Sequence, residues 1–277
     1  MEGVSKKGRQ LGRKKAQLDF ALRFWRLTHF AKRIGGATQF KQMLGLIASE
    51  RAFKGSFIPV DEEIEIPPSV VAPREILLDY IKRASVRAIV HECPCRKGQG
   101  CQEHPVDLGC LLLGEGAASV DPGIAYLASV EEAIAHLDRA LESGLLPLLG
   151  HLLIDKYIFG LRDFDRFVTL CFCCDCCCVV RSGMKNLVGA YPDSLVRLEG
   201  VTVEVTDDCV GCGECVPVCP IENVRLEGNT AVIGDRCLGC GSCARACSRG
   251  YIRVAVDQSS SPLQDLRRRV EAGVRIE

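Results

Sequence analysis

Residues 207–220, DDCVGCGECVPVCP, and residues 235–248, DRCLGCGSCARACS, repeat one spacing of cysteines at an interval of 28 positions. Each copy reads C-x2-C-x2-C-x3-C, and the second copy has Ser248 where the first has Pro220. Three thiolates from so short a loop can bind three corners of an iron–sulfur cube, and the fourth must come from elsewhere. Glycines in both loops let backbone N–H groups turn toward the sulfurs. The repeat therefore indicates two metal-binding loops that are built alike.

Over about 55 residues this repeat resembles the two-cluster bacterial ferredoxins, in which the fourth cysteine of each motif ligates the other cluster. The resemblance implies two [4Fe–4S] clusters. One would be held by Cys209, Cys212, Cys215 and Cys247, and the other by Cys237, Cys240, Cys243 and Cys219. Ser248 departs from the proline of that family, which affects the expected backbone shape more than the ligands. Two zinc sites are the alternative, but zinc modules with four ligands pair two C-x2-C units and lack this spacing.

A second group of cysteines lies in residues 91–110, HECPCRKGQGCQEHPVDLGC, with the spacing C-x-C-x5-C-x8-C. Glycines and prolines make this segment rich in turns, and His91 and His104 lie close to the thiols in sequence. Four thiols on such a segment suit one metal centre. The residue types leave three interpretations open: a further iron–sulfur cluster, zinc bound by cysteine and histidine, or redox-active thiols. The candidate ligands are Cys93, Cys95, Cys101 and Cys110.

The third group is CFCCDCCC, residues 171–178, which places six cysteines in eight positions. In an extended chain alternate residues share a face, so Cys171 and Cys173 are expected to point one way and the later alternate cysteines the other. We expect this run to bind metal together with residues 93–110, to approach them closely in space and to face the repeat. Disulfide or persulfide chemistry is the main alternative. The candidate ligands are Cys171, Cys173, Cys174, Cys176, Cys177 and Cys178.

Hydrophobic periodicity predicts an α+β protein in which a mixed α/β cysteine-rich domain precedes a small ferredoxin-like dicluster domain. Helices are expected from Pro73 to about Ala84 and after the capping box that begins at Ser129. A buried strand is expected from Phe167 to Cys173, and short strands should separate the two cysteine loops. The expected divisions are a basic helical arm (1–57), the cysteine-rich domain (58–198), the dicluster domain (199–257) and a charged tail (258–277).

Charge is unevenly distributed along a chain of net charge zero. Residues 1–54 carry 13 Lys and Arg against three acidic residues, a net charge of +10. A helix is expected from Lys15 to Ile34, with an apolar stripe that starts at Phe20 and Phe24, and a second helix from Thr38 to about Glu50. The basic helix could pack on its own protein or lie on an anionic membrane surface. Nucleic-acid binding is the weakest interpretation.

Cysteine usage and apolar runs bear on the cellular environment. The 18 cysteines occur in a chain of 277 residues, 47% of them apolar, which is long enough to bury a core without disulfides. The basic start has no apolar segment of the secretory type. The longest apolar run, 145–154, is interrupted by polar and helix-breaking residues and is shorter than the roughly 20 residues of a membrane span. We expect reduced thiols and a cytoplasmic protein, with peripheral membrane association left open.

These patterns favour an iron–sulfur electron-transfer protein, or the electron-input subunit of an oxidoreductase, which would need a redox partner protein. The alternatives are an oxidoreductase with a catalytic cluster in residues 91–178, where His91 or His104 would supply protons, and a protein that delivers sulfur or clusters. From about residue 58 to residue 256, the order of the motifs resembles dicluster-domain iron–sulfur proteins of anaerobes. That resemblance implies joint use of the cysteines and no particular reaction.

Overall fold

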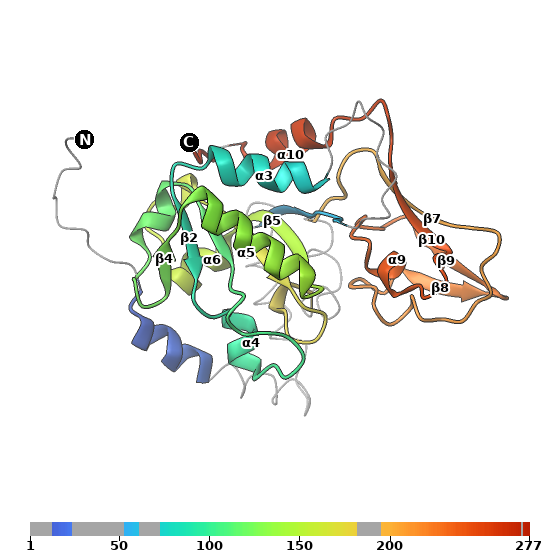
Figure 1. Ribbon diagram of the computed structural model, residues 1–277, viewed down its shortest axis with the longest axis horizontal. Helices are drawn as coiled ribbons and strands as arrows, with labels where there is room; N and C mark the ends of the chain where they lie inside the picture. Colours follow the sequence, from blue (N-terminus) through green and yellow to red (C-terminus); the bar gives the residue numbers. More distant parts are fainter. Residues whose placement is uncertain (1–12, 24–52, 61–72, 182–194, 273) are drawn as a thin grey trace, which may run out of the picture.

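The computed structural model describes residues 13–23, 53–60, 73–181, 195–272 and 274–277 (Figure 1). The helix expected from Thr38 to Glu50 lies outside these residues. Helices and antiparallel sheets make up the rest, so the α+β class is confirmed. None of the helices within these ranges is long and apolar enough to cross a membrane.

A six-stranded antiparallel sheet forms the centre of the larger domain. Its strand order is β1-β5-β6-β3-β2-β4. Strand β6 lies in the interior of the sheet, where β5 and β3 pair with its two edges. The predicted strand from Phe167 to Cys173 is therefore confirmed. The strands are β1 (Phe53–Phe57), β2 (Arg87–Val90), β3 (Leu111–Leu113), β4 (Ala125–Leu127), β5 (Leu146–Leu152) and β6 (Val168–Cys173).

Both faces of this sheet are apolar, because helices cover each of them. Successive strand residues point to opposite faces, so Ile89 packs in one core while Ala88 and Val90 pack in the other. Helices α3 (Pro73–Arg83) and α5 (Val130–Glu142) cover the first face. The helical residues 15–23, the 3-10 turn η1 (Glu115–Ser119) and helix α6 (Leu153–Phe159) cover the second. The remaining short elements of this domain are α4 (Pro94–Gln99) and η2 (Phe164–Arg166).

Two helix starts follow the signals seen in the sequence. Pro73 occupies the first turn of α3, where its missing N–H costs nothing. Ser129 caps α5 with its hydroxyl, and the carboxylate of Glu132 accepts a hydrogen bond from the backbone N–H of Ser129 at 2.8 Å. Both predicted helices are confirmed.

The basic arm is described only in residues 13–23. This part is helical from residue 15, and Leu18 and Leu22 are buried against the second face of the sheet. Phe20 is 62% exposed, so the apolar stripe predicted to start at Phe20 is wrong in this part. The described part of the helix packs on the larger domain through Leu18 and Leu22.

The smaller domain consists of short strands around the two cysteine loops (Figure 1). Strands β7 (Val201–Val205) and β10 (Ile252–Val256) pair with each other, as do β8 (Val224–Glu227) and β9 (Thr230–Ile233). A single short helix, α9 (Ser242–Ala246), follows within the second loop. The short strands expected between the loops are confirmed, and the buried apolar residues here are few.

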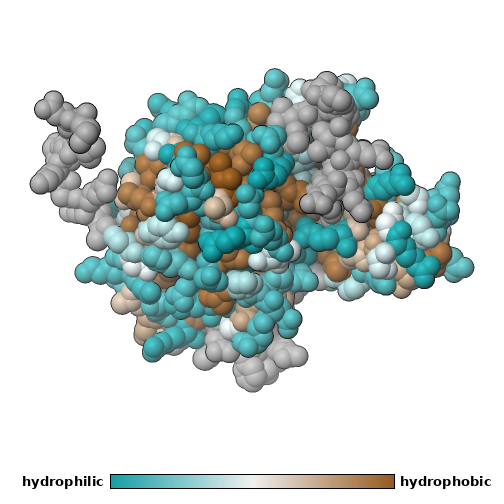
Figure 2. Space-filling model, viewed as in Figure 1, coloured by the Kyte–Doolittle hydropathy of each residue, from teal (hydrophilic) through white to brown (hydrophobic). Residues whose placement is uncertain are grey.

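The chain then returns to the larger domain. Helix α10 (Pro262–Val270) lies beside α3 (Figure 1), and its Leu266 and Val270 are fully buried. The guanidinium of Arg83 on α3 donates to both carboxylate oxygens of Glu271 at 3.0 and 3.2 Å. The segment expected as a charged tail, 258–277, thus contains a helix that packs into the main core. Figure 2 shows that hydrophilic residues cover most of the visible surface, with apolar patches over the larger domain.

Replacing Leu266 with alanine should destabilise the larger domain by about 2–5 kcal/mol, because this side chain is fully buried in the core and its truncation leaves a cavity there. The measurement is the free energy of urea-induced unfolding, followed by circular dichroism. Gln264→Ala on the same helix is the matched control, since Gln264 is exposed. Equal stability of the two variants would contradict the packing of α10.

Candidate metal centres

The cysteines of the repeat surround two separate cavities. The first, about 310 Å³ including its opening to solvent, is lined by Cys209, Cys212, Cys215 and Cys247. The second, about 340 Å³ on the same basis, is lined by Cys219, Cys237, Cys240 and Cys243. Each cavity therefore collects three thiols from one motif and the last thiol from the other. This is the grouping that the resemblance to ferredoxins implies.

Backbone N–H groups point at the sulfurs of both cavities. In the second cavity, Gly239 donates to Cys237 at 3.4 Å and Asn223 to Cys219 at 3.2 Å. In the first, Ala231 donates to Cys209 at 3.4 Å and Tyr251 to Cys247 at 3.3 Å. Such hydrogen bonds stabilise thiolate charge and raise the reduction potential of a bound cluster. The donor set and the cavities fit iron–sulfur clusters.

Ser248, which stands where the first motif has proline, links the two loops. Its backbone N–H and its hydroxyl donate to Glu214 in the first motif, at 3.3 and 2.8 Å. A proline could make neither bond. The departure from the repeat therefore adds a contact across the pseudo-symmetric halves.

Residues 208–252 match a family model described as a 4Fe-4S dicluster domain. This part of the chain is a ferredoxin-like 4Fe-4S domain. It binds iron–sulfur clusters, and together with the many cysteines it indicates a role in electron transfer. No curated protein and no solved structure matches the chain.

The other ten cysteines are in the larger domain, and seven of them line a pocket of about 530 Å³, again counted with its opening. We call six of these seven, all but Cys174, the pocket thiols. The pocket lies between strand β6 and helix α6, whose Ile154, Ile158 and Phe159 form an apolar wall. Cys174 is the seventh cysteine that lines the pocket. The pocket thiols are Cys93, Cys95, Cys110, Cys171, Cys173 and Cys178.

The pocket thiols contact one another, and their contacts perturb their acidities. Cys110 directly precedes β3 and Cys171 lies in β6, and their sulfurs are 3.7 Å apart. A hydrogen bond from Cys95 lowers the pKa of Cys93 to about 7. Hydrogen bonds from Cys173 and Cys95 hold the pKa of Cys178 well below its usual value. Part of the group is therefore ready to carry negative charge at neutral pH.

Two charged side chains that the sequence analysis did not single out face the same pocket. Arg96 is fully buried and donates to the carbonyl oxygens of Phe172, at 2.9 Å, and Leu108. Its Nε has no hydrogen-bond partner among the described residues. A buried cation needs negative charge nearby, which thiolates or a thiolate-bound cluster would supply. Burial raises the pKa of Asp155 to about 7, although Thr169 donates a hydrogen bond to it.

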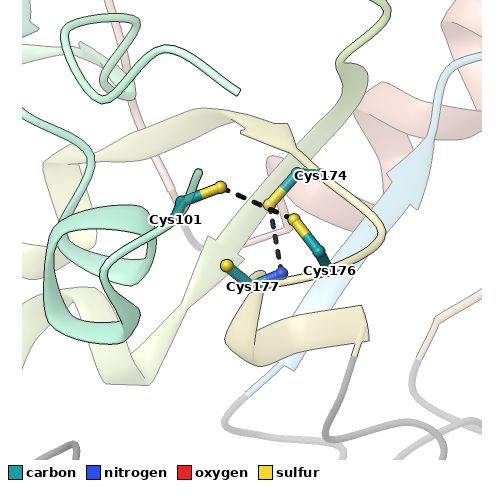
Figure 3. Close-up of side chains that lie close together, drawn as sticks. All are labelled: Cys101, Cys174, Cys176 and Cys177. Carbon is teal, nitrogen blue, oxygen red and sulfur yellow. Dashed lines mark hydrogen bonds between the residues drawn. The ribbon is translucent and has the colours of Figure 1, made fainter. Parts of the chain in front are cut away.

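The four remaining cysteines lie close together around the turn at residues 175–177 (Figure 3). We call them the turn thiols. Their sulfurs all lie within 4.8 Å of one another, and those of Cys101 and Cys176 are 3.5 Å apart. Cys174 is buried, whereas Cys176 is exposed. The turn thiols are Cys101, Cys174, Cys176 and Cys177.

The expected approach of the two sequence-distant groups is confirmed. Sulfur contacts join Cys110 to Cys171 and Cys101 to Cys176. The expectation that the whole run stays extended is wrong, because β6 ends at Cys173 and residues 175–177 form a turn. That turn brings Cys178 back into the pocket alongside Cys173.

The two histidines considered as proton donors are not among the residues that line this pocket. His91 is exposed and contacts the carbonyl oxygen of Pro122 at 3.0 Å. His104 lies 3.5 Å from the Asp175 carboxylate, beside the turn thiols. The carboxyl that could exchange protons within the pocket is that of Asp155, and no short sequence motif marks it.

The Gly211→Ala variant should lose iron from the 4Fe-4S domain. Gly211 has φ +66°, and an added Cβ would lie 2.7 Å from the backbone carbon of Asn229. Gly228 is the matched control, because its φ is +59° but a Cβ there meets nothing within 4 Å. Both variants carry a similar left-handed backbone cost of roughly 1 kcal/mol. Iron and acid-labile sulfide per chain, measured after anaerobic purification, should fall in Gly211→Ala only; equal contents would contradict the close packing of this loop.

Proposed function

We propose that this chain is an electron-transfer protein, or the electron-input subunit of an oxidoreductase, in which the 4Fe-4S domain exchanges electrons with an iron–sulfur centre in the pocket. When bound, such clusters accept and release single electrons. Cys209, Cys212, Cys215 and Cys247 would hold one [4Fe–4S] cluster. Cys219, Cys237, Cys240 and Cys243 would hold the other. The pocket thiols would hold the additional centre.

The observation that carries this proposal is the direct contact between the segment that follows the cysteine run and the first cysteine loop, residues 207–220. Arg181, three residues after Cys178, is buried and donates to the carbonyl oxygen of Val218 at 3.2 Å. Val218 immediately precedes Cys219. A short covalent and hydrogen-bonded path therefore joins a pocket thiol to a thiol of the 4Fe-4S domain. Electron exchange requires neighbouring centres, and this contact supports that arrangement.

The docking of the two domains is also apolar. Leu238 and Cys240 of the second loop belong to the same buried cluster as Leu148 and Phe172 of the six-stranded sheet. Arg245 on α9 donates to the carbonyl oxygen of Gly144 at 2.8 Å. A shared core holds the second cavity at a constant distance from the pocket, which suits a fixed electron path better than a mobile carrier domain.

Within the pocket, the chain supplies charge balance and a dry environment. Arg96 offsets negative charge on Cys93, Cys110 and neighbouring thiols, and the side chains of α6 give the pocket an apolar wall. An apolar surrounding and a nearby cation act in opposite directions on the reduction potential of a cluster. The balance between them would set the potential of the pocket centre relative to the 4Fe-4S domain.

A catalytic role of the pocket is the second candidate, and Asp155 favours it. This buried carboxyl changes its protonation near neutral pH and lies in the pocket wall with Cys110 and Cys171. An acid of this kind could deliver a proton to a small substrate as electrons arrive. The apolar pocket would admit only a small molecule, and the substrate class is open. Delivery of sulfur or clusters fits less well, because most of the pocket thiols are buried.

The proposal includes a redox partner protein and a cytoplasmic location. The net charge of +10 on residues 1–54 supports electrostatic association with an acidic partner or an anionic membrane surface. Of this arm, residues 15–23 pack on the larger domain through Leu18 and Leu22. The basic residues on other faces remain the part that would meet a partner.

The Cys212→Ser variant should lose one [4Fe–4S] cluster, or about four irons and four sulfides per chain, and should destabilise the 4Fe-4S domain because its own core is small. Iron and sulfide analysis with low-temperature electron paramagnetic resonance is the measurement. Ser242→Ala, in the other loop and without a proposed ligand role, is the control. Full retention of iron in Cys212→Ser would overturn the ligand assignment.

The Cys95→Ser variant tests the pocket centre. If the pocket holds a cluster, the unmodified chain should contain well over the roughly eight irons of two [4Fe–4S] clusters, and the variant should fall toward that number. The spectrum of the 4Fe-4S domain should remain. About eight irons in both proteins would contradict a metal centre in the pocket and would favour thiol chemistry there instead.

A further inference from the structure

The turn thiols are spaced differently from the other cysteine groups. Among the described residues, two groups bring three or more possible metal-ligand atoms within 4.8 Å of one another. One group is the turn thiols, and the other, which overlaps with it, is His104, Asp175 and Cys176. The eight cysteines of the 4Fe-4S domain form no such set; they surround cavities of about 310 and 340 Å³. The same chain therefore offers both wide and narrow arrangements of four thiols.

The narrow spacing suits one ion. Four sulfurs at about 2.3 Å from a tetrahedral Zn²⁺ are about 3.8 Å apart. The 3.5 Å between Cys101 and Cys176, and the 4.8 Å limit for the whole group, bracket this value. In a [4Fe–4S] cluster each thiolate binds a different iron, so the cube itself holds the sulfurs farther apart. The turn thiols leave no room for a cube between them.

The local backbone agrees with a single-ion site. Cys174 and Cys177 are spaced C-x2-C, the spacing typical of four-thiolate metal loops. The N–H of Cys177 donates to the sulfur of Cys174 at 3.3 Å, as Figure 3 shows. The third and fourth thiols come from the same turn and from Cys101 after α4. The His104 and Asp175 pair lies beside them and would orient the ligands from outside.

We propose that Cys101, Cys174, Cys176 and Cys177 bind a single divalent ion, Zn²⁺ or Fe²⁺, as four thiolates. Binding releases one proton from each thiol and adds no inorganic sulfide. The ion would tie the turn at residues 175–177 to the loop after α4. Because Cys174 also lines the pocket, the site would close the pocket at that side. This assignment does not depend on a cluster in the pocket.

The test compares Cys176→Ser with Cys212→Ser in the full-length protein purified without oxygen. Zinc, iron and acid-labile sulfide are measured per chain. The Cys176→Ser variant should lose about one metal ion and no sulfide, whereas Cys212→Ser should lose iron and sulfide together. Cys176 is exposed, so its replacement should leave the fold intact, and unchanged sulfide reports that directly. Which metal falls distinguishes Zn²⁺ from Fe²⁺.

Loss of sulfide along with iron in a folded Cys176→Ser protein would show that the turn thiols hold a cluster. Unchanged metal content would show that they bind no ion. If this variant does not fold, Cys101→Ser removes a ligand from the other segment. The unmodified protein gives an independent readout, because [4Fe–4S] clusters contain equal iron and sulfide. Total zinc and iron should exceed sulfide by one per chain, and equality would overturn the proposal.

Discussion

The pairing of strand β6 with β5 on one edge and β3 on the other is the constraint on which the cysteine-rich domain depends. A strand in the interior of a sheet has a fixed register, so its alternate residues must divide between two faces. Leu170 packs in the core beneath α3 and α5, while Cys171 and Cys173 line the pocket. Cys110 directly precedes β3, whose Leu111 pairs with Leu170 of β6. The pairing of these strands therefore brings the thiols of Cys110 and Cys171, 61 residues apart in the chain, within 3.7 Å of each other.

The charges of the pocket thiols favour binding of a cation. Burial penalises a charged thiolate, yet hydrogen bonds among the pocket thiols favour charge on Cys93 and Cys178. Arg96 supplies one positive charge for a group of six thiols. Further thiolates could form there only with more positive charge, and bound iron is the kind of ion that supplies it. The pocket therefore buries thiols whose ionisation requires more positive charge than Arg96 supplies.

In the 4Fe-4S domain, cysteines compensate for a small apolar core. Its strands are four or five residues long and bury few apolar side chains of their own. Ligation must then contribute folding free energy, and contacts with the larger domain add to it. Leu238 and Cys240 pack into the shared core, and α10 carries the chain back onto α3 and β1. The two domains consequently share part of one apolar core, and Arg181 contacts Val218 of the first loop.

The sequence by itself determined the features that depend on local chemistry. The repeated C-x2-C-x2-C-x3-C spacing, the capping box at Ser129 and the apolar segment before Cys173 each act over a few residues, and each was predictable. The tertiary structure decided what long-range packing controls. The chain turns after Cys173, and the ten cysteines divide into the pocket thiols and the turn thiols. Arg96 and Asp155 come to lie at the pocket. Spacing along the chain carries no information on these points, because strand register and helix packing, which join distant segments, set the distances between those sulfurs and charges.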